Sequence, residues 1–224
     1  MTVGVLAVQG DFAEHAAVLR SLGVDTAEVR LPDQLEAVDA LILPGGESTT
    51  IARLMDLYHL REPVIRRVRD GMAVWGTCAG MIMLASRMRD DRPQPLGLMD
   101  MEVARNAFGR QVDSFEADIV CSHLDGGPLQ AVFIRAPSVV AVGPSVEVLA
   151  TLADGTPVAV REGNMLATAF HPELTEDRRL HAAFVASVAD ASVGGAEDAV
   201  RSGGAPGVGG ADGPPAGGAP ANGG

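Results

Sequence analysis

Short apolar runs alternate with amphipathic stretches through the first half of the chain. The apolar runs predict strands at Val3–Val8, Val24–Val29, Asp39–Leu43 and Met72–Trp75. Apolar residues at helical spacing predict helices at Phe12–Leu22, Ser48–Tyr58 and Ala79–Arg87. Strands that are apolar throughout are typical of a parallel sheet buried on both faces, and the alternation with helices places helices on each side of that sheet.

The pattern changes after Leu96, where short apolar segments follow one another closely. They predict strands at Met99–Arg105, Phe115–Val120, Ala131–Arg135, Val139–Val142, Val146–Leu152, Val158–Arg161 and Met165–Phe170. A last helix is predicted at Pro172–Asp190. The sequence therefore predicts an α/β fold of three layers: a doubly wound, mostly parallel sheet with helices on both faces and added antiparallel strands.

The C-terminal part of the chain differs in composition from the rest. Between Gly203 and Gly224, ten Gly, four Pro and five Ala leave almost no side chain that can build a core. We therefore expect residues 1–190 to form one folded domain, and residues 191–224 to form a disordered tail rich in Gly, Ala and Pro.

The charged residues exclude several classes of function. All 17 basic residues are Arg, so the chain has neither the Lys of a Walker-type phosphate loop nor an amine for a Schiff base. A formal net charge of −12 disfavours nucleic acid and anionic membranes as partners, because both would be repelled. Two Cys and the lack of a secretory leader predict a cytoplasmic protein, and no pattern predicts a metal or a cofactor.

The segment Gly76-Thr-Cys-Ala-Gly80 lies between a predicted strand and a predicted helix. Small residues at this turn are typical of a nucleophile elbow, in which a strained backbone holds the nucleophile above the sheet. A helix N-terminus favours the thiolate of Cys78, and the backbone N–H of Ala79 would point at an oxyanion on an attacked carbonyl. We therefore predict Cys78 as a nucleophile, whereas Cys121 has no such surroundings and is expected to be a small buried residue.

A thiolate nucleophile needs a base that titrates near neutral pH, for which His is the first candidate. His171 follows a predicted strand at the edge where the active-site loops of such sheets emerge, and Glu173 could hold its ring by accepting a ring N–H. The alternative for this segment is a helix start, with Pro172 at its first position. Of the other four histidines, we expect His15, His59 and His181 to pack or face solvent in helices, and His123 to lie in a turn.

The segment Pro44-Gly-Gly-Glu-Ser-Thr49 joins a predicted strand to a predicted helix, for which Ser48 is a suitable N-cap. Its glycine backbone can present a second N–H to an oxyanion, while Glu47 and Ser48 contact a polar substrate. An ordinary strand-to-helix turn is the alternative.

Taken together, three of these segments resemble a known family. Pro44–Thr49, Gly76–Gly80 and His171–Glu173, in this order, resemble the triad-type class I glutamine amidotransferases. The segments Gly4–Gly10, Arg105–Gln111 and Phe133–Pro137 are similar to the glutaminase subunits of pyridoxal 5'-phosphate synthases. The resemblance covers about residues 2 to 190 and implies the class I glutamine amidotransferase fold.

The resemblance implies hydrolysis of L-glutamine to L-glutamate and ammonia through a thioester. Cys78 would be the nucleophile, His171 the general base and acid, and Glu173 the residue that orients His171. The backbone N–H groups near Gly46 and Ala79 would form the oxyanion hole. The residues that would bind L-glutamine are Gly46, Glu47, Ser48, Arg105, Ile134 and Arg135. Which of the two Arg faces the substrate carboxylate stays open.

The resemblance also implies a partner. The family supplies ammonia to a barrel-shaped synthase subunit, a lyase that builds pyridoxal 5'-phosphate (vitamin B6), and the two form a large hetero-oligomer. Gln9 and Gly10 would lie at the interface that activates the site. The alternatives are a different triad enzyme on the same scaffold, such as the glutaminase for imidazole glycerol phosphate synthesis or a Cys hydrolase, and a non-catalytic binding or regulatory subunit.

Overall fold

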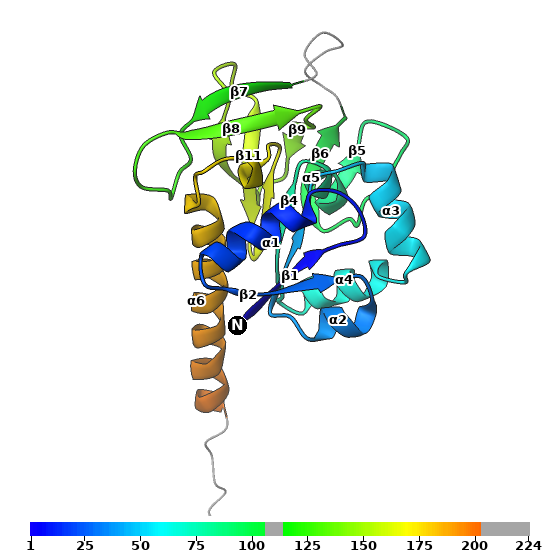
Figure 1. The fold of residues 1–224 in the computed structure, drawn as a ribbon, viewed down its shortest axis with the longest axis vertical. Coiled ribbons are helices and arrows are strands. Elements are labelled where there is room, and N and C mark those ends of the chain that lie inside the picture. Colours follow the sequence, from blue (N-terminus) through cyan, green and yellow to red (C-terminus); the bar gives the residue numbers. More distant parts are fainter. Residues whose placement is uncertain (106–113, 203–224) are drawn as a thin grey trace, which may run out of the picture. The chain divides into compact units, whose positions relative to one another are not determined.

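A computed structural model describes residues 1–105 and 114–202, and side chains are described up to Asp190 (Figure 1). Residues Met1–Asp190 form one compact unit. Most of the predicted Arg105–Gln111 segment, and the predicted tail from residue 203 onward, lie outside the described residues. Within the described ranges, no helix is long and apolar enough to cross a bilayer.

The centre of the first unit is a seven-stranded sheet with the order β10-β11-β12-β4-β3-β1-β2. Its strands are β1 (Thr2–Leu6), β2 (Asp25–Val29), β3 (Ala40–Leu43), β4 (Ala73–Thr77), β10 (Glu147–Thr151), β11 (Pro157–Glu162) and β12 (Met165–Thr168). The neighbours from β12 to β2 pair in parallel, while β11 pairs antiparallel to both β12 and β10. The predicted mostly parallel sheet with added antiparallel strands is confirmed.

Helices cover both faces of this sheet, as successive residues of β4 demonstrate. Trp75 packs on the rings of His15 and His181, which belong to helices α1 (Phe12–Ser21) and α6 (Arg179–Ser202). Gly76 faces the backbone of α5 (Ala79–Leu84), which a Cβ at this position would strike. Because neighbouring residues of a strand point to opposite faces, α1 and α6 lie on one side of β4 and α5 on the other. Figure 1 shows α1 crossing one face of the sheet.

Three further helices and two small sheets complete the unit. The helices are α2 (Pro32–Glu36), α3 (Ser48–Leu57) and α4 (Arg61–Arg69). A three-stranded sheet consists of β5 (Ala85–Met88), β6 (Met99–Ala104) and β9 (Ser138–Val142), and a two-stranded sheet of β7 (Ser114–Ile119) and β8 (Leu129–Ile134). The two-stranded sheet adds Phe133 to the core, where its ring contacts Phe170.

Two predicted helices differ from the structure. The helix predicted at Ala79–Arg87 ends at Leu84, because the following residues pair with β6 as strand β5. The helix predicted at Pro172–Asp190 consists of a 3₁₀ turn, η1 (Pro172–Leu174), followed by α6. The carboxylate of Asp177 accepts the backbone N–H of Arg179 at 3.0 Å, which provides the new start for α6. The helical backbone continues to Ser202, past the predicted end at Asp190.

Candidate active site

Cys78 lies at the turn between β4 and α5, in the strained conformation predicted for a nucleophile elbow. Its φ of 47° and ψ of −104° lie in a region that L residues rarely adopt. The turn depends on its glycines: a Cβ at Gly76 would strike the carbonyl of Gly80, and one at Gly80 would strike the carbonyl of Leu43. The chain therefore reverses within a few residues and presents the thiol at the edge of the sheet.

The parallel pairing of β4 and β12 brings the two predicted catalytic segments to this edge. Thr168, the last residue of β12, pairs with Thr77, the last residue of β4. The N–H of Cys78 donates to the Thr168 carbonyl at 2.8 Å, and the N–H of His171 donates to the Val132 carbonyl at 2.8 Å. Residues far apart in the sequence thus meet where two adjacent strands end.

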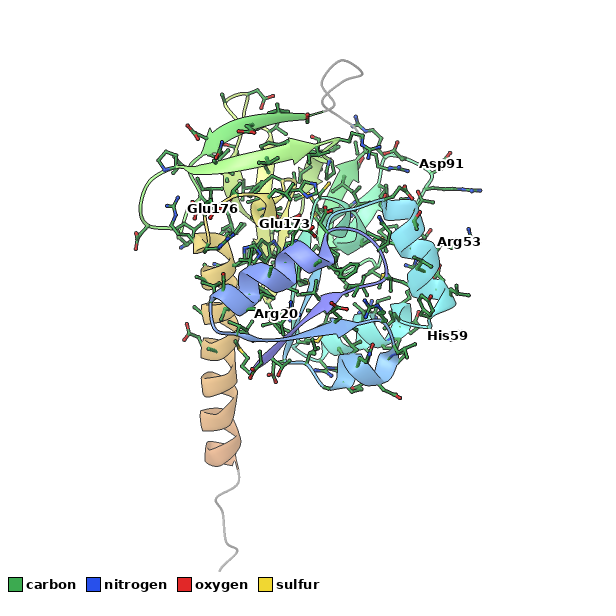
Figure 2. The ribbon with its side chains drawn as sticks, in the orientation of Figure 1. Arg20, Arg53, His59, Asp91, Glu173 and Glu176 are labelled. Atoms are coloured by element: carbon green, nitrogen blue, oxygen red, sulfur yellow. The ribbon has the colours of Figure 1, made fainter. Side chains whose placement is uncertain are left out.

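The ring of His171 is held by carboxylates on its Nδ1 side. Nδ1 lies 2.7 Å from Oε1 of Glu173 and 3.4 Å from Oδ2 of Asp11. The Glu173 side chain is fully buried, whereas that of Asp11 is 39% exposed. Figure 2 shows Glu173 beside α1. With Nδ1 engaged, the other ring nitrogen, Nε2, is left for the thiol of Cys78.

The pKa values at this site follow from burial and from these contacts. Burial alone would lower the pKa of His171, but its hydrogen bonds with Asp11, Cys78 and Glu173 raise that pKa to about 12. Burial raises the pKa of Glu173, and the hydrogen bond from His171 offsets part of that rise. The arrangement therefore stabilises a protonated His171 next to an ionised carboxylate.

Cys78 and His171 open on a cavity of about 320 Å³. The predicted site residues that line it are Gly46, Glu47, Ser48, Cys78, Ala79, Arg105, Ile134, Arg135 and His171. Glu173 lies behind the ring of His171 rather than in the lining. Gln9, predicted at the activating interface, and two residues that the sequence did not indicate, Asp11 and Ile82, also face the cavity.

The loop of Gly45 and Gly46 packs tightly against the base. A Cβ on Gly45 would strike the ring of His171, and one on Gly46, with φ of 150°, would lie 2.6 Å from Oε1 of Gln9. The carbonyl of Gly45 accepts the N–H of Asp11 at 3.1 Å, and Oε1 of Gln9 accepts the N–H of Glu47 at 2.8 Å. Only glycine allows the two loops to approach this closely.

Glu47, rather than Ser48, is the N-cap of α3, which corrects the prediction. Its carboxylate accepts the N–H of Thr50 at 2.6 Å and that of Thr49 at 3.2 Å, as a longer side chain reaches the first turn. Burial acts to raise the pKa of Glu47, but the hydrogen bonds from Thr50 and Thr49 lower it overall. The guanidinium of Arg105 lies 3.4 Å from the same carboxylate. The cavity therefore has a fixed pair of opposite charges at its rim.

Behind Glu173 lie two histidines that the sequence placed only as packing or surface residues. His15 and His181 are fully buried, and Nε2 of His15 lies 3.3 Å from Oε2 of Glu173 and 3.1 Å from Oγ1 of Thr77. The sequence contains one indication for His15: Asp11 and His15 are four residues apart, and this spacing places them on the same face at the start of α1. His181 gave no such signal, since its contacts depend on how α6 packs.

The remaining predicted candidates lie elsewhere. His59 is exposed at the end of α3 (Figure 2), and His123 forms a 2.8 Å contact with Glu147 on the surface. Cys121 is buried, and burial raises the pKa of its thiol.

One group of side chains in the described part of the chain is close enough to be considered for a metal ion. Its members, Asp11, His171 and Glu173, offer ligand atoms within 4.8 Å of one another. Both carboxylates, however, approach the same ring nitrogen of His171, which is the arrangement expected for holding a proton.

Residues 5–190 match the model of the SNO glutamine amidotransferase family. The chain is 58% identical over 188 residues to the pyridoxal 5'-phosphate synthase subunit PdxT of Salinispora tropica, covering 81% of this chain and 94% of that protein. It is 59% identical over 193 residues to the PdxT subunit of Acidothermus cellulolyticus, covering 84% of this chain and 93% of that protein. The predicted resemblance is thereby confirmed.

Solved structures agree with this relationship. A crystal structure described as a glutamine amidotransferase superposes with a TM-score of 0.79 at 51% sequence identity, covering 84% of this chain and 98% of that one. The structure of PurLQS from Thermotoga maritima, at 16% identity, has a TM-score of 0.64 over 84% of this chain and 98% of that one, and supports the fold alone. By its sequence over residues 5–190 and by its fold, the chain belongs to the SNO glutamine amidotransferase family.

Proposed function

We propose that this chain is the glutaminase subunit of a pyridoxal 5'-phosphate synthase and hydrolyses L-glutamine with Cys78, His171 and Glu173. The observation that carries the catalytic assignment is the thiol of Cys78, held by a strained turn at the cavity where Glu173 anchors His171. The relatives named PdxT, at 58% and 59% identity over most of their length, support the choice of reaction and pathway.

The first half of the reaction forms a thioester. In the resting site Nε2 of His171 already holds the proton of the Cys78 thiol, and the thiolate attacks the side-chain amide carbon of glutamine. The resulting oxyanion is held by backbone N–H groups at Gly46 and Ala79, both of which line the cavity. His171 then returns the proton to the amide nitrogen, the C–N bond breaks, and ammonia leaves.

The second half releases glutamate. A water molecule gives a proton to His171 and attacks the thioester carbon, and the second tetrahedral intermediate expels the thiolate of Cys78, which restores its pairing with protonated His171. Glu173 stabilises the imidazolium form of His171 in both halves, as the short 2.7 Å contact at Nδ1 supports.

The substrate would lie along the cavity lining. Gly46, Glu47, Ser48, Arg105, Ile134 and Arg135 surround the space in front of Cys78 and are proposed to bind L-glutamine. A guanidinium is suited to the α-carboxylate of glutamine, because its N–H groups match the two carboxylate oxygens. Arg105 already lies 3.4 Å from Glu47, and we therefore assign the α-carboxylate to Arg135.

Ammonia released into water becomes protonated and stops being a nucleophile, so the product is useful only if a second subunit receives it. We propose a barrel-shaped synthase subunit as that receiver, in a large cytoplasmic hetero-oligomer, with Gln9 and Gly10 near the interface. Gln9 lines the cavity, and its side-chain oxygen accepts the N–H of Glu47. These contacts support a link between that interface and the site.

The decisive experiment measures glutamate release from glutamine by the wild type and by C78A, each with and without the cognate synthase subunit. We expect release that requires Cys78 and increases with the partner. No release from the bound complex would reject the glutaminase reaction. Release that depends on Cys78 but ignores the partner would reject the pairing alone.

A further inference from the structure

A buried pair of imidazole rings lies on the side of Glu173 that faces away from the cavity. Nδ1 of His15 lies 3.0 Å from Nε2 of His181, and Nε2 of His15 lies 3.3 Å from Oε2 of Glu173 and 3.1 Å from Oγ1 of Thr77. Both rings are fully buried, against the indole of Trp75. The carboxylate of Glu173 is therefore approached by an imidazole on each oxygen, His171 at Oε1 and His15 at Oε2.

The buried atoms that lack a hydrogen bond determine which ring nitrogens of His15 and His181 carry the protons. Among the described residues, Oε2 of Glu173 and Nδ1 of His181 are buried without a hydrogen bond. If His181 carries its proton on Nε2, it donates to Nδ1 of His15 and leaves only an acceptor unpaired. The other tautomer would leave a buried N–H unpaired, which is the costlier fault. His15 then carries its own proton on Nε2, the atom next to Thr77 and Glu173.

Ionisable groups from several elements surround the His15–His181 pair. They are Glu173 in η1, His171 just before η1, and Arg178 just before α6, and Asp11 before α1 acts on Glu173. Strand β4 contributes Thr77 and Trp75. Burial is the main reason that the pKa of His15 lies well below its usual value, and burial with the nearby charge of Arg178 lowers the pKa of His181 to about 3. Both rings are therefore neutral hydrogen-bond donors at neutral pH.

We propose that His15 is a positioning residue for glutaminase chemistry: its Nε2–H, which contacts Oγ1 of Thr77, is the donor available to Oε2 of Glu173, and His181 fixes the tautomer that keeps it there. A carboxylate buried this deeply tends to take up a proton, and a protonated Glu173 cannot stabilise the imidazolium of His171. A neutral N–H donor keeps the carboxylate ionised without adding a positive charge that would repel His171. A small rotation of the His15 ring from Thr77 toward Oε2 would complete this bond, opposite the imidazolium of His171.

The inference rests on the proposed triad, and it differs from a purely structural role for the two rings. A ring that only fills space against Trp75 would matter through its volume. A positioning ring matters through the location of one N–H group. Two amide substitutions separate these roles, because the side-chain nitrogen of Gln falls near the place of His Nε2, and that of Asn near the place of His Nδ1.

The test compares H15Q with H15N in the complete complex with the synthase subunit, by glutamate release from pH 5 to 9. H15Q retains a donor toward Glu173, and we expect it to stay within about threefold of the wild-type kcat. H15N lacks that donor, and we expect a loss in kcat of about 10- to 100-fold with KM little changed. The pH below which glutamate release by H15N falls should rise by about one unit, since Glu173 loses a donor that favours its ionised form.

Equal losses in both variants, with unchanged pH profiles, would overturn the proposal in favour of a packing role. A third variant, E173Q, separates this failure from failure of the triad. If E173Q is fully active, the triad itself is wrong; if E173Q is impaired but H15N is not, the inference about His15 alone fails.

A measurement on the wild type keeps the proposal testable if either variant does not fold. In ¹⁵N spectra of the imidazole groups, we expect His15 and His181 to stay neutral from pH 6 to 9 with the proton on Nε2. A protonated His15, or one with its proton on Nδ1, would overturn the proposal.

Discussion

His171 and His15 contact the two oxygens of one carboxylate, Glu173, but their pKa values move in opposite directions. On the cavity side, hydrogen bonds with Asp11, Cys78 and Glu173 outweigh burial and raise the pKa of His171 to about 12. On the interior side, burial, together with the nearby rings of His181 and His171, lowers the pKa of His15 well below its usual value.

The difference shows that proximity to a carboxylate does not by itself make a histidine cationic. The pKa depends on whether charged partners repay the cost of removing an imidazolium from water. Asp11 is still partly open to solvent and lies next to His171, whereas His15 is enclosed by Trp75, Thr77 and His181. The cavity side therefore carries the charge that the reaction needs, and the interior side supplies neutral hydrogen bonds.

The largest effect is expected from removing the nucleophile on the cavity side. C78A should lower glutaminase turnover by roughly 10³-fold or more, because Cys78 supplies the one thiol among the described residues that line the cavity. The matched control is C121A, which removes the other buried thiol, outside the cavity lining. Glutamate release should separate them clearly, and equal rates for the two variants would show that Cys78 is not the nucleophile.

A loss of similar or slightly smaller size is expected for H171N, which removes Nε2, the nitrogen proposed to accept the thiol proton. Turnover should fall by about 10²- to 10⁴-fold at all pH values. H123N provides the comparison, since His123 lies on the surface, where its ring contacts the exposed carboxylate of Glu147. Normal hydrolysis by H171N would remove this residue from the mechanism.

Much of the cavity side could be predicted from the sequence, because that side is built largely from local patterns, although Asp11 and Ile82 were not indicated. A small-residue turn between a strand and a helix indicated Cys78, and a His-Pro-Glu segment after a strand indicated His171 and Glu173. The mostly parallel sheet followed from the alternation of strands and helices, and that prediction is confirmed. Parallel pairing of β4 with β12 then brings the two segments to one edge.

The interior side could not be predicted, because it depends on packing between distant elements. His15 and His181 are 166 positions apart and meet only because α1 and α6 cover the same face of β4. In one other segment, pairing between strands determined the structure instead of the local helical pattern. Ala85–Met88 continues a helical pattern but forms strand β5, since pairing with β6 satisfies its backbone groups.

A smaller effect on the cavity side is expected for D11N. Asp11 raises the pKa of His171, and D11N should therefore move the titration of that ring to lower pH and reduce kcat about two- to tenfold. The measurement is the imidazole titration of His171 by NMR, alongside the pH profile of glutamate release. E14Q is the matched control, because it removes a carboxylate from the same helix at an exposed position. A shift that is the same in both variants would mean that only net charge matters.

The smallest effect concerns stability rather than rate, and it tests the interior side directly. A histidine whose pKa is lowered by folding takes up a proton on unfolding. Its contribution to stability is thus complete above the unfolded value of about 6.5 and is lost as pH falls toward the folded value. His181, with a folded pKa of about 3, should reduce the free energy of unfolding by up to roughly 1.4 kcal/mol per pH unit below pH 6. His171, whose pKa is raised, contributes in the opposite sense: its stabilisation is complete below about 6.5 and is lost as pH rises toward 12.

Urea unfolding of the chain at pH 7, 6 and 5 measures this slope. H181F keeps an aromatic ring against Trp75 and removes one buried titrating group. We therefore expect the dependence of the unfolding free energy on pH to weaken by the contribution of one proton, roughly 1.4 kcal/mol per pH unit. H59N is the control, because His59 is exposed and its positive φ of 56° suits Asn. An unchanged slope in H181F would mean that the interior ring is charged in the folded protein. The two sides of Glu173 would then no longer differ in charge, and the neutral donor assigned to His15 would have to be abandoned.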